Sequence, residues 1–178
     1  MKPDAHFALN LEEQFDRWHP AIFRYYRLRG ADADTANDLT SAVFERAYQQ
    51  AGRYDPRLGA ISTWLFTIAR NTAANYWRSQ AAQTLGGLDA WENLPSLEVS
   101  PEEALVALES RAEVLAALPG LDPRERELLA LKFASRLNNR QIAGMTGLSE
   151  SNVGVILYRA LHHLRAIILS KTGEGSRE

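Results

Sequence analysis

A run of polar side chains between residues 62 and 79 carries the clearest chemical signal in this sequence. These side chains recur at spacings of three and four, so a helix through the segment would place them on one face. They are Thr67, Arg70, Asn71, Asn75 and Arg78. Amide groups donate and accept hydrogen bonds at base edges, and guanidinium groups pair with phosphates. Because no acidic residue interrupts the face, it predicts contact with a nucleic acid.

Catalytic and metal-binding chemistry has little support in the sequence. The chain has 178 residues and no cysteine, which excludes disulfides, thiolate zinc ligands and thiol nucleophiles. His162 and His163 are adjacent, so on a helix they point about 100° apart and do not form a one-turn metal pair. No phosphate-binding loop, nucleophile elbow or persuasive carboxylate pair occurs. We therefore expect neither an enzyme nor a bound metal ion or other cofactor.

Three helices in the first half are expected to hold the polar face in place. Apolar residues recur at helical spacing from Leu11 to Ile22 and again from Leu39 to Ala47. Arg29-Gly30 predicts the end of the first helix, and Asp34 is a plausible N-cap for the second. The third helix is expected from Ser62. Its apolar face consists of Leu65, Ile68, Ala69, Thr72 and Tyr76.

Charge divides the sequence into three unequal parts. The net charge is -2, but residues 1–79 hold 10 basic and 9 acidic side chains, residues 80–114 hold 1 and 7, and residues 115–178 hold 9 and 6. The middle part opens with AAQTLGGLDAWENLPSLEVSP, whose glycine pair and prolines interrupt any helical period. We therefore expect an all-α protein of two small helical domains joined by a flexible acidic linker.

The expected boundaries follow these breaks. They are a tail over 1–10, a first domain over 11–79, a linker over 80–99, a second domain over 100–170 and a tail over 171–178. The first residues lack the apolar core of a signal peptide, and no stretch approaches the ~18 apolar residues of a spanning helix. We expect a cytoplasmic protein without membrane insertion.

The second domain is marked by helix-start signals. Ser100-Pro101 and Asp122-Pro123 each combine a capping residue, a proline at the first helical position and a glutamate three residues after the cap. Asn138 or Asn139 can cap a short helix, and Gly147 can end it in a left-handed conformation.

A longer helix follows from Ser149, its expected N-cap. Its inward residues are expected to be Val153, Leu157, Ala160, Leu161 and Leu164. Two helices joined by a short turn that contains glycine fit a helix-turn-helix, whose second helix enters a DNA major groove. On this stretch alone, a plain helical bundle stays open as an alternative.

Two blocks of motifs stand on either side of the linker. The first is DLTSAVFERAY followed by STWLFTIARNTAANYWR, and the second is LPGLDPRERELLALKF followed by RQIAGMTGLSESNVGVILYRALHHLR. Together they resemble a bacterial RNA polymerase sigma factor of the extracytoplasmic-function (ECF) group. The resemblance implies that the first domain binds core RNA polymerase and opens the minus-ten element, and that the second reads the minus-thirty-five element. The implied partners are core RNA polymerase and promoter DNA, with an anti-sigma factor as a further partner that the family allows.

The resemblance assigns roles in the first domain. The residues implied to bind the minus-ten element are Tyr54, Thr67, Arg70, Asn71, Asn75 and Arg78. Tyr54 and Asn71 would capture a flipped base, although Tyr54 could equally pack its loop down. The residues implied to bind polymerase are Asp38, Leu39, Val43, Phe44 and Arg46. Core packing is the competing interpretation for the three apolar ones, and for Trp64.

The minus-thirty-five assignment departs from the family pattern. Gly154, Val155 and Ile156 stand where relatives commonly have basic and small polar residues. The remaining candidates are Arg140, Ser151, Asn152, Tyr158, Arg159 and His162. Either the helix reads thymine methyl groups, or its apolar patch binds a protein such as an anti-sigma factor.

A second class of function also fits the helix-turn-helix. A polymerase-independent regulator would bind an operator by itself, usually as a dimer. Such a regulator has no need for the first block of motifs, which favours the sigma factor. The acidic linker then either imitates nucleic acid along a basic path of polymerase or serves as a spacer.

Overall fold

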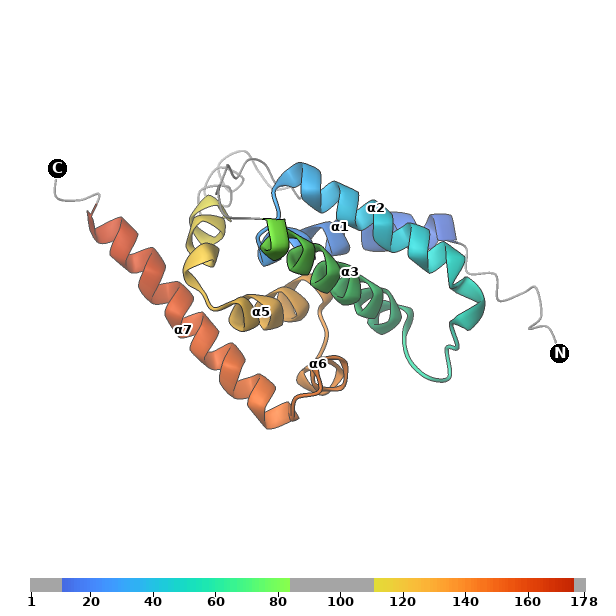
Figure 1. Ribbon diagram of the computed structural model, residues 1–178. Coiled ribbons are helices and arrows are strands. Elements are labelled where there is room, and N and C mark those ends of the chain that lie inside the picture. Colours follow the sequence, from blue (N-terminus) through green and yellow to red (C-terminus); the bar gives the residue numbers. More distant parts are fainter. Residues whose placement is uncertain (1–10, 84–110, 175–178) are drawn as a thin grey trace, which may run out of the picture.

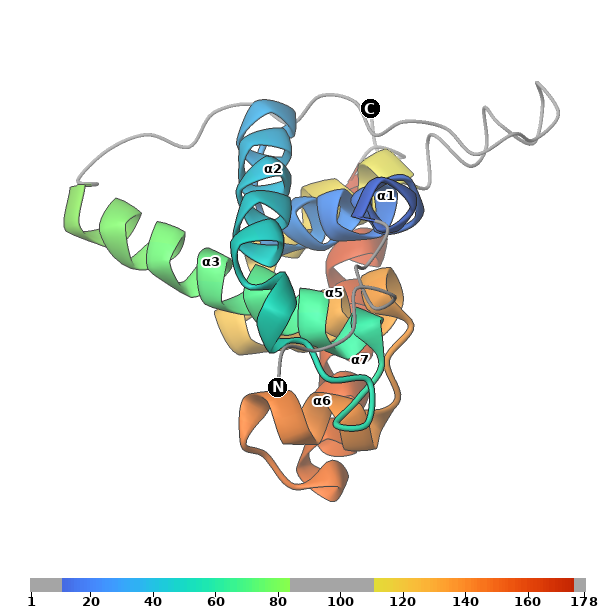
Figure 2. The same cartoon turned by 90° about the vertical axis from the view of Figure 1, so that its right-hand side faces the viewer.

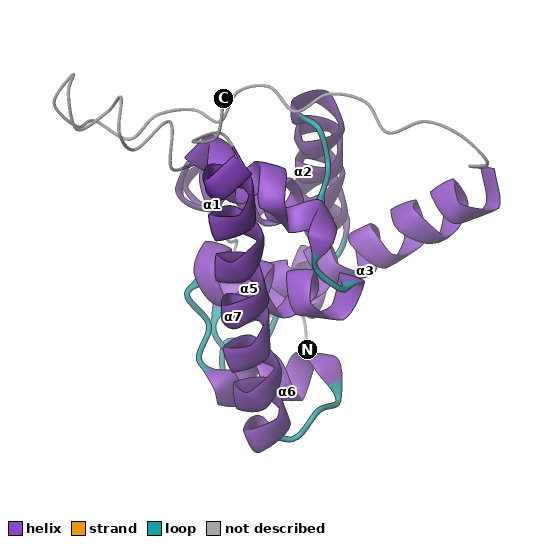
Figure 3. Cartoon of the chain, turned by 90° about the vertical axis from the view of Figure 1, so that its left-hand side faces the viewer, coloured by secondary structure: helices purple, strands orange, loops and turns teal. Residues whose placement is uncertain are grey.

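The computed structural model describes residues 11–83 and 111–174, and all regular structure within these ranges is helical (Figure 3). Three α-helices form the N-terminal domain: α1 (Leu11–Arg29), α2 (Ala33–Gln49) and α3 (Ile61–Gln83) (Figure 1). A short 3-10 helix, η2 (Ala51–Arg53), opens the loop between α2 and α3. The expected all-α class is confirmed.

The turn between α1 and α2 corrects one sequence expectation. Gly30 has φ 109°, a conformation that favours glycine, and α1 ends directly before it. The N-cap of α2 is Asp32, whose carboxylate accepts a hydrogen bond of 2.7 Å from the backbone N–H of Thr35. Asp34 lies inside the first turn instead, where its charge still favours the positive end of the helix dipole.

Aromatic side chains pack α1 against α3 in the N-terminal domain. Tyr25, Tyr26 and Phe66 are fully buried and pack edge to face. The Tyr26 hydroxyl donates a 3.0 Å hydrogen bond to the backbone carbonyl of Ala69, which ties α1 to α3. The position of the polar face on α3 is therefore set from its buried side.

The C-terminal domain follows the expected capping signals closely. Residues 111–117 are helical and are followed by η3 (Leu118–Gly120), α5 (Pro123–Ser135), α6 (Asn139–Thr146) and α7 (Glu150–Glu174). Asp122 and Asn138 both form complete capping boxes, and Gly147 ends α6 with φ 73°. The backbone N–H of Asn152 donates to the Ser149 hydroxyl at 3.2 Å, as expected of an N-cap. The predicted start at Ser100-Pro101 lies outside the described residues.

Helix α7 buries a narrower stripe than the sequence predicted. Val153, Leu157 and Ala160 are buried and Leu164 is partly buried, but Leu161 is 45% exposed. Leu161 follows Ala160 by one residue and so points about 100° away from it. Because α5 and α6 pack on one side of α7 only, Leu161 falls at the uncovered edge.

The apolar character of α7 bears on the expectation that no helix inserts into a membrane. Among the described residues, the segment Glu150–Ser170 is the one helix long and apolar enough to cross a membrane by length and composition, with a mean hydropathy of 1.3. Length and composition do not by themselves define a span, because Val153 and Leu157 of this helix pack in the core. The absence of membrane insertion stays a prediction.

The two helical domains pack directly against each other. Helix α5 lies between α7 and the N-terminal helices in Figure 1, and its principal neighbour there is α1. Buried residues of both domains form one continuous apolar cluster. In Figure 2 α6 lies below α3 and α5, and Gln141 of α6 contacts Thr63 at the start of α3 at 3.5 Å. The sequence left this arrangement open.

Candidate nucleic-acid interface

The polar face of α3 is present as the spacing predicted. Thr67, Asn71, Asn75 and Arg78 are exposed, while Leu65, Ile68 and Ala69 are buried on the opposite side. The Arg78 guanidinium donates to the Asn75 side-chain oxygen at 3.4 Å, so these two groups lie together. Two amides and a cation on an exposed face are suited to bases and phosphates.

An aromatic pair lies at the start of α3. The rings of Tyr54 and Trp64 have centroids 5.2 Å apart, and Trp64 packs against the core. The Tyr54 hydroxyl donates to the carbonyl oxygen of Gly59 at 3.2 Å, which closes the loop between η2 and α3. Burial, with the Asp55 carboxylate nearby, raises the pKa of Tyr54, so the phenol stays neutral at physiological pH. The pair offers a partly buried aromatic surface beside the polar face.

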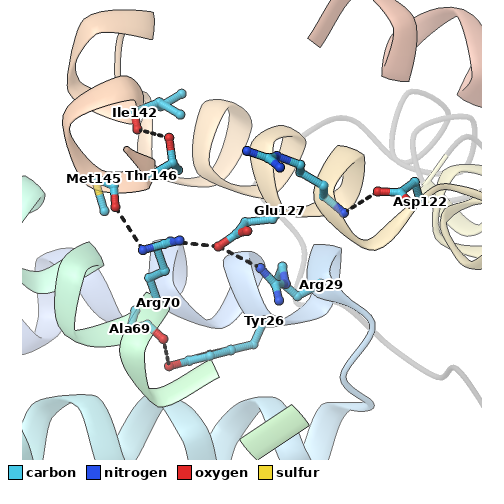
Figure 4. Close-up of polar contacts among 10 residues, drawn as sticks. Tyr26, Arg29, Ala69, Arg70, Asp122, Glu127, Ile142, Met145 and Thr146 are labelled. Carbon is cyan, nitrogen blue, oxygen red and sulfur yellow. Dashed lines mark hydrogen bonds and ion pairs between the residues drawn. The ribbon is translucent and has the colours of Figure 1, made fainter. Parts of the chain in front are cut away.

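Arg70 departs from the rest of the polar face because it is tied to the other domain. Its Nε donates to Glu127 of α5 at 2.9 Å, and its Nη1 donates to the carbonyl oxygen of Met145 in α6 at 2.9 Å (Figure 4). Arg29 at the end of α1 reaches the same Glu127 oxygen at 3.2 Å. The Arg29 guanidinium also lies 4.9 Å from the ring centroid of Trp77 in α3.

The sequence did not single out Arg29 or Glu127 as site residues. Glu127 stands 57 residues after Arg70, within the charged run RERE. By its local sequence alone, this run indicates the solvent-exposed first turns of a helix. Only the packing of α5 against α1 and α3 brings the three charges together. These residues line a cleft of about 410 Å³ between the domains, together with Arg124 and others.

The helix-turn-helix presents the expected residues on α7. Ser151, Asn152, Arg159 and His162 are exposed there, and Arg140 is exposed on α6. Tyr158 is 66% exposed, and its ring centroid lies 4.3 Å from that of His162. The neighbouring His163 instead contacts the Glu125 carboxylate at 2.9 Å.

The apolar patch on this helix is smaller than the sequence indicated. Val155 is 44% exposed, but Ile156 is partly buried against the core. A side chain at Gly154 would meet the amide of Asn139 at 3.7 Å, so this position faces α6. Of the three residues, only Val155 is free to touch a thymine methyl group or a partner.

Helix α2 separates the expected polymerase-binding residues into two groups. Leu39, Val43 and Phe44 are buried, so their side chains pack the core, as the competing interpretation held. Asp38 is exposed. Arg46 is half-buried and donates a hydrogen bond to the Thr72 hydroxyl of α3, which limits its reach outward.

Comparison with known proteins agrees with this division into two domains. Residues 14–83 match the family described as Sigma-70 region 2, and residues 111–164 match Sigma-70, region 4. The ECF RNA polymerase sigma factor BldN of Streptomyces coelicolor is 32% identical over 158 residues, which cover 86% of this chain and 58% of BldN. The ECF RNA polymerase sigma factor SigM of Bacillus subtilis is 26% identical over 160 residues, which cover 89% of this chain and 95% of SigM.

Two solved structures share the arrangement of helices. The sigma factor RpoE in complex with the anti-sigma factor NepR from Bartonella quintana has a TM-score of 0.72 at 19% identity, covering 88% of this chain and 95% of that one. CnrH in complex with the cytosolic domain of CnrY has a TM-score of 0.66 at 21% identity, covering 90% and 88%. At these identities the likeness shows the fold alone.

The exposed polar helix lies in the match to Sigma-70 region 2 and the helix-turn-helix in the match to region 4, so the chain is a protein of the sigma-70 class. Within that class, this chain belongs to the extracytoplasmic-function group of RNA polymerase sigma factors, as its sequence resemblance indicated. A sigma factor is a transcription initiation subunit that directs RNA polymerase to promoters. The chain spans 58% of the length of BldN.

Proposed function

We propose that this chain is a dissociable subunit that brings core RNA polymerase to specific promoters in the cytoplasm and performs no bond chemistry itself. The proposal depends on the order of two features along the chain. An exposed face of α3 without acidic residues comes first and a helix-turn-helix second, and these features lie in the matches to Sigma-70 regions 2 and 4. In this proposal residues 11–79 serve the minus-ten element and residues 100–170 the minus-thirty-five element.

The aromatic pair and Asn71 are proposed to hold a non-template base outside the duplex. Flipping a base out of the stack costs a few kcal/mol. Stacking on an aromatic side chain returns ~1 to 3 kcal/mol per base, which offsets much of that cost. Tyr54 and Trp64 supply the aromatic surface, and the exposed amide of Asn71 supplies hydrogen bonds.

The remaining residues of the polar face are proposed to hold the separated strand. Thr67, Asn75 and Arg78 are exposed on α3, and Arg70 joins them when it is released from Glu127. Each phosphate that a cation neutralises releases counterions, so binding becomes steeply dependent on salt.

Helix α7 is proposed to enter the major groove of the minus-thirty-five element. Ser151 and Asn152 lie at its N-terminus, where recognition helices contact base edges, and Tyr158 and Arg159 follow. Arg140 and His162 lie exposed beside them and are proposed to meet phosphates. A footprint over this element that disappears with Arg159→Ala would support DNA reading by this helix.

Core RNA polymerase is proposed to bind the outer side of α2. Asp38 is the exposed residue of the expected set, while Leu39, Val43 and Phe44 position the helix from below. An anti-sigma factor is proposed as a further partner, because RpoE from Bartonella quintana, which has a similar fold, was determined in complex with the anti-sigma factor NepR.

Run-off transcription with core polymerase on a genomic fragment library tests the proposal and returns the promoter at the same time. On that promoter, Asn71→Ala should reduce open-complex formation. The control is Asp16→Ala, which removes an exposed polar side chain of α1 that the proposal does not use. Equal activity of both variants would show that Asn71 has no part in opening DNA.

The polymerase-independent regulator makes the opposite prediction about binding. A chain with net charge -2 should bind DNA weakly alone and depend on polymerase for electrostatic attraction. Co-purification with core polymerase would support the sigma factor. Tight promoter binding by the isolated chain at physiological salt, without polymerase, would support the regulator.

A further inference from the structure

Three charged side chains join the two domains at the edge of the polar face. Glu127 of α5 accepts contacts from Arg70 at 2.9 Å and from Arg29 at 3.2 Å (Figure 4). Their side chains are 19%, 32% and 14% exposed, so solvent screens them less than it screens a surface pair. We call Arg29, Arg70 and Glu127 the interdomain latch.

Contacts with the C-terminal domain occupy two of the donor groups that Arg70 would offer to DNA. Its Nε is directed to Glu127 and its Nη1 to the Met145 carbonyl, one on α5 and one on α6. A phosphate that reached Arg70 would take the place of the Glu127 carboxylate, since both are anions that pair with a guanidinium in the same way.

The spacing of promoter elements makes the packed arrangement incompatible with reading both elements. The minus-ten and minus-thirty-five elements lie about 25 base pairs apart, which is about 85 Å at 3.4 Å per base pair. In the packed state the donor of Arg70 lies 2.9 Å from an atom of α6, the first helix of the helix-turn-helix. The domains must therefore separate before both elements are held.

The interface between the two domains contains features that favour separation of the domains. The pKa of Arg24 is lowered mainly by burial and further by the nearby charges of Arg136 and Arg111. The pKa of Arg126 is also lowered mainly by burial, with a smaller effect from the charge of Arg29. The Arg24 Nε is buried without a hydrogen-bond partner. Repulsion between guanidinium groups and an unsatisfied buried polar atom both cost free energy in the packed state. Glu127 is the acidic group that offsets the repulsion between Arg29 and Arg70.

We propose that the interdomain latch keeps the free chain closed and withholds Arg70 from promoter DNA, with the Glu127 carboxylate as an internal competitor of the DNA phosphate. The competition with DNA rests on the proposed function of Arg70 at the minus-ten element. Closure by the latch does not depend on that function and is measured separately.

The separation of the domains can be measured directly because the chain has no cysteine of its own. Ala74→Cys on α3 and Gly144→Cys on α6 create two labelling sites, both exposed, and a side chain added at Gly144 meets nothing within 4 Å. Spin labels at these sites report the interdomain distance. Glu127→Gln should convert a single short distance into a broad, longer distribution, and Arg29→Gln should do the same.

The binding arm uses a fluorescein-labelled single strand carrying the non-template minus-ten sequence of the promoter that run-off transcription returns. If only open molecules bind the strand, the apparent affinity for it is reduced by the fraction of molecules that are open. A variant that abolishes the closed state therefore raises the apparent affinity by the inverse of that fraction. Loss of a charged hydrogen bond should therefore tighten binding by about tenfold or more in Glu127→Gln. Arg29→Gln should also gain affinity, whereas Arg70→Gln should open the domains without the gain.

A matched control removes the same charge elsewhere. Glu113→Gln lies exposed on the helix of residues 111–117, away from the latch, and should change neither the distance nor the affinity beyond a small charge effect. An unchanged distance in both Glu127→Gln and Arg29→Gln would overturn the proposal. Opening without tighter DNA binding than in Glu113→Gln would overturn the competition. Failure of the wild-type chain to support transcription would refute the proposed function instead, and the distance measurement would still judge the latch.

Discussion

Tyr54 offers the sharpest test of the proposed capture of a flipped base, because its ring and its hydroxyl make different contacts. The ring lies 5.2 Å from that of Trp64, and the hydroxyl donates to Gly59 at 3.2 Å. Tyr54→Ala removes both contacts, and Tyr54→Phe removes the hydroxyl alone. The pair of variants separates base stacking from anchoring of the loop.

The expected magnitudes follow from these contacts. Stacking of a base on an aromatic ring contributes ~1 to 3 kcal/mol, so Tyr54→Ala should slow open-complex formation by about 5- to 150-fold. An exposed hydrogen bond contributes ~0.5 kcal/mol at the lower end of the usual range, so Tyr54→Phe should lose only about twofold. Permanganate reactivity of thymines in the minus-ten element measures strand opening in each case.

A loop-anchoring role would give another pattern. If Tyr54 only holds the loop down, Tyr54→Phe should lose a large share of what Tyr54→Ala loses, and thermal unfolding should move in parallel. Equal permanganate reactivity of Tyr54→Ala and the wild-type chain would refute base capture by this ring.

Capping, salt dependence and titration provide three further tests. Asp122→Ala removes the capping box of α5 and should lower the free energy of unfolding by ~1 kcal/mol in chemical denaturation, whereas Asp16→Ala, an exposed residue of α1, should change it far less. Arg140→Gln should reduce the salt slope of promoter binding by the polymerase complex by about 0.9, and an unchanged slope would exclude a phosphate contact. Hydrogen bonds from Arg57 lower the pKa of Asp55 to about 2, so the Asp55 carboxylate stabilises its loop at pH above about 4, and this contribution fades as the pH falls toward 2. An NMR titration of Asp55 should show the pKa rising toward ~3.9 in Arg57→Gln.

Local features of the structure were predictable because short-range chemistry decides them. The caps at Asp122, Asn138 and Ser149 each pair with a backbone N–H two or three residues away, so their sequence context is sufficient. Gly147 ends α6 because glycine adopts a positive φ without steric cost. The N-cap of α2 was predicted at Asp34 but lies two positions earlier, at Asp32. Both residues can cap a helix, and only the turn after Gly30 selects between them.

The candidate site was predictable only in part, because helical periodicity shows which residues share a face but not what covers that face. Periodicity identifies which side of α3 is polar, and the exposed Asn71, Asn75 and Arg78 follow from it. Periodicity does not say which elements cover a helix, and so Leu161 was expected in the core but lies exposed.

By itself, the sequence determined the class of this protein. The class follows from two blocks of motifs in a fixed order, and the caps and helical faces within each block depend only on residues a few positions apart. Only the tertiary structure decided what those faces meet. Arg70 lies on the predicted polar face, yet its partners are Glu127 and Met145, 57 and 75 residues away. Contacts across such separations arise from the packing of α5 against α1, because burial of apolar surface brings together charged residues that lie far apart in the sequence.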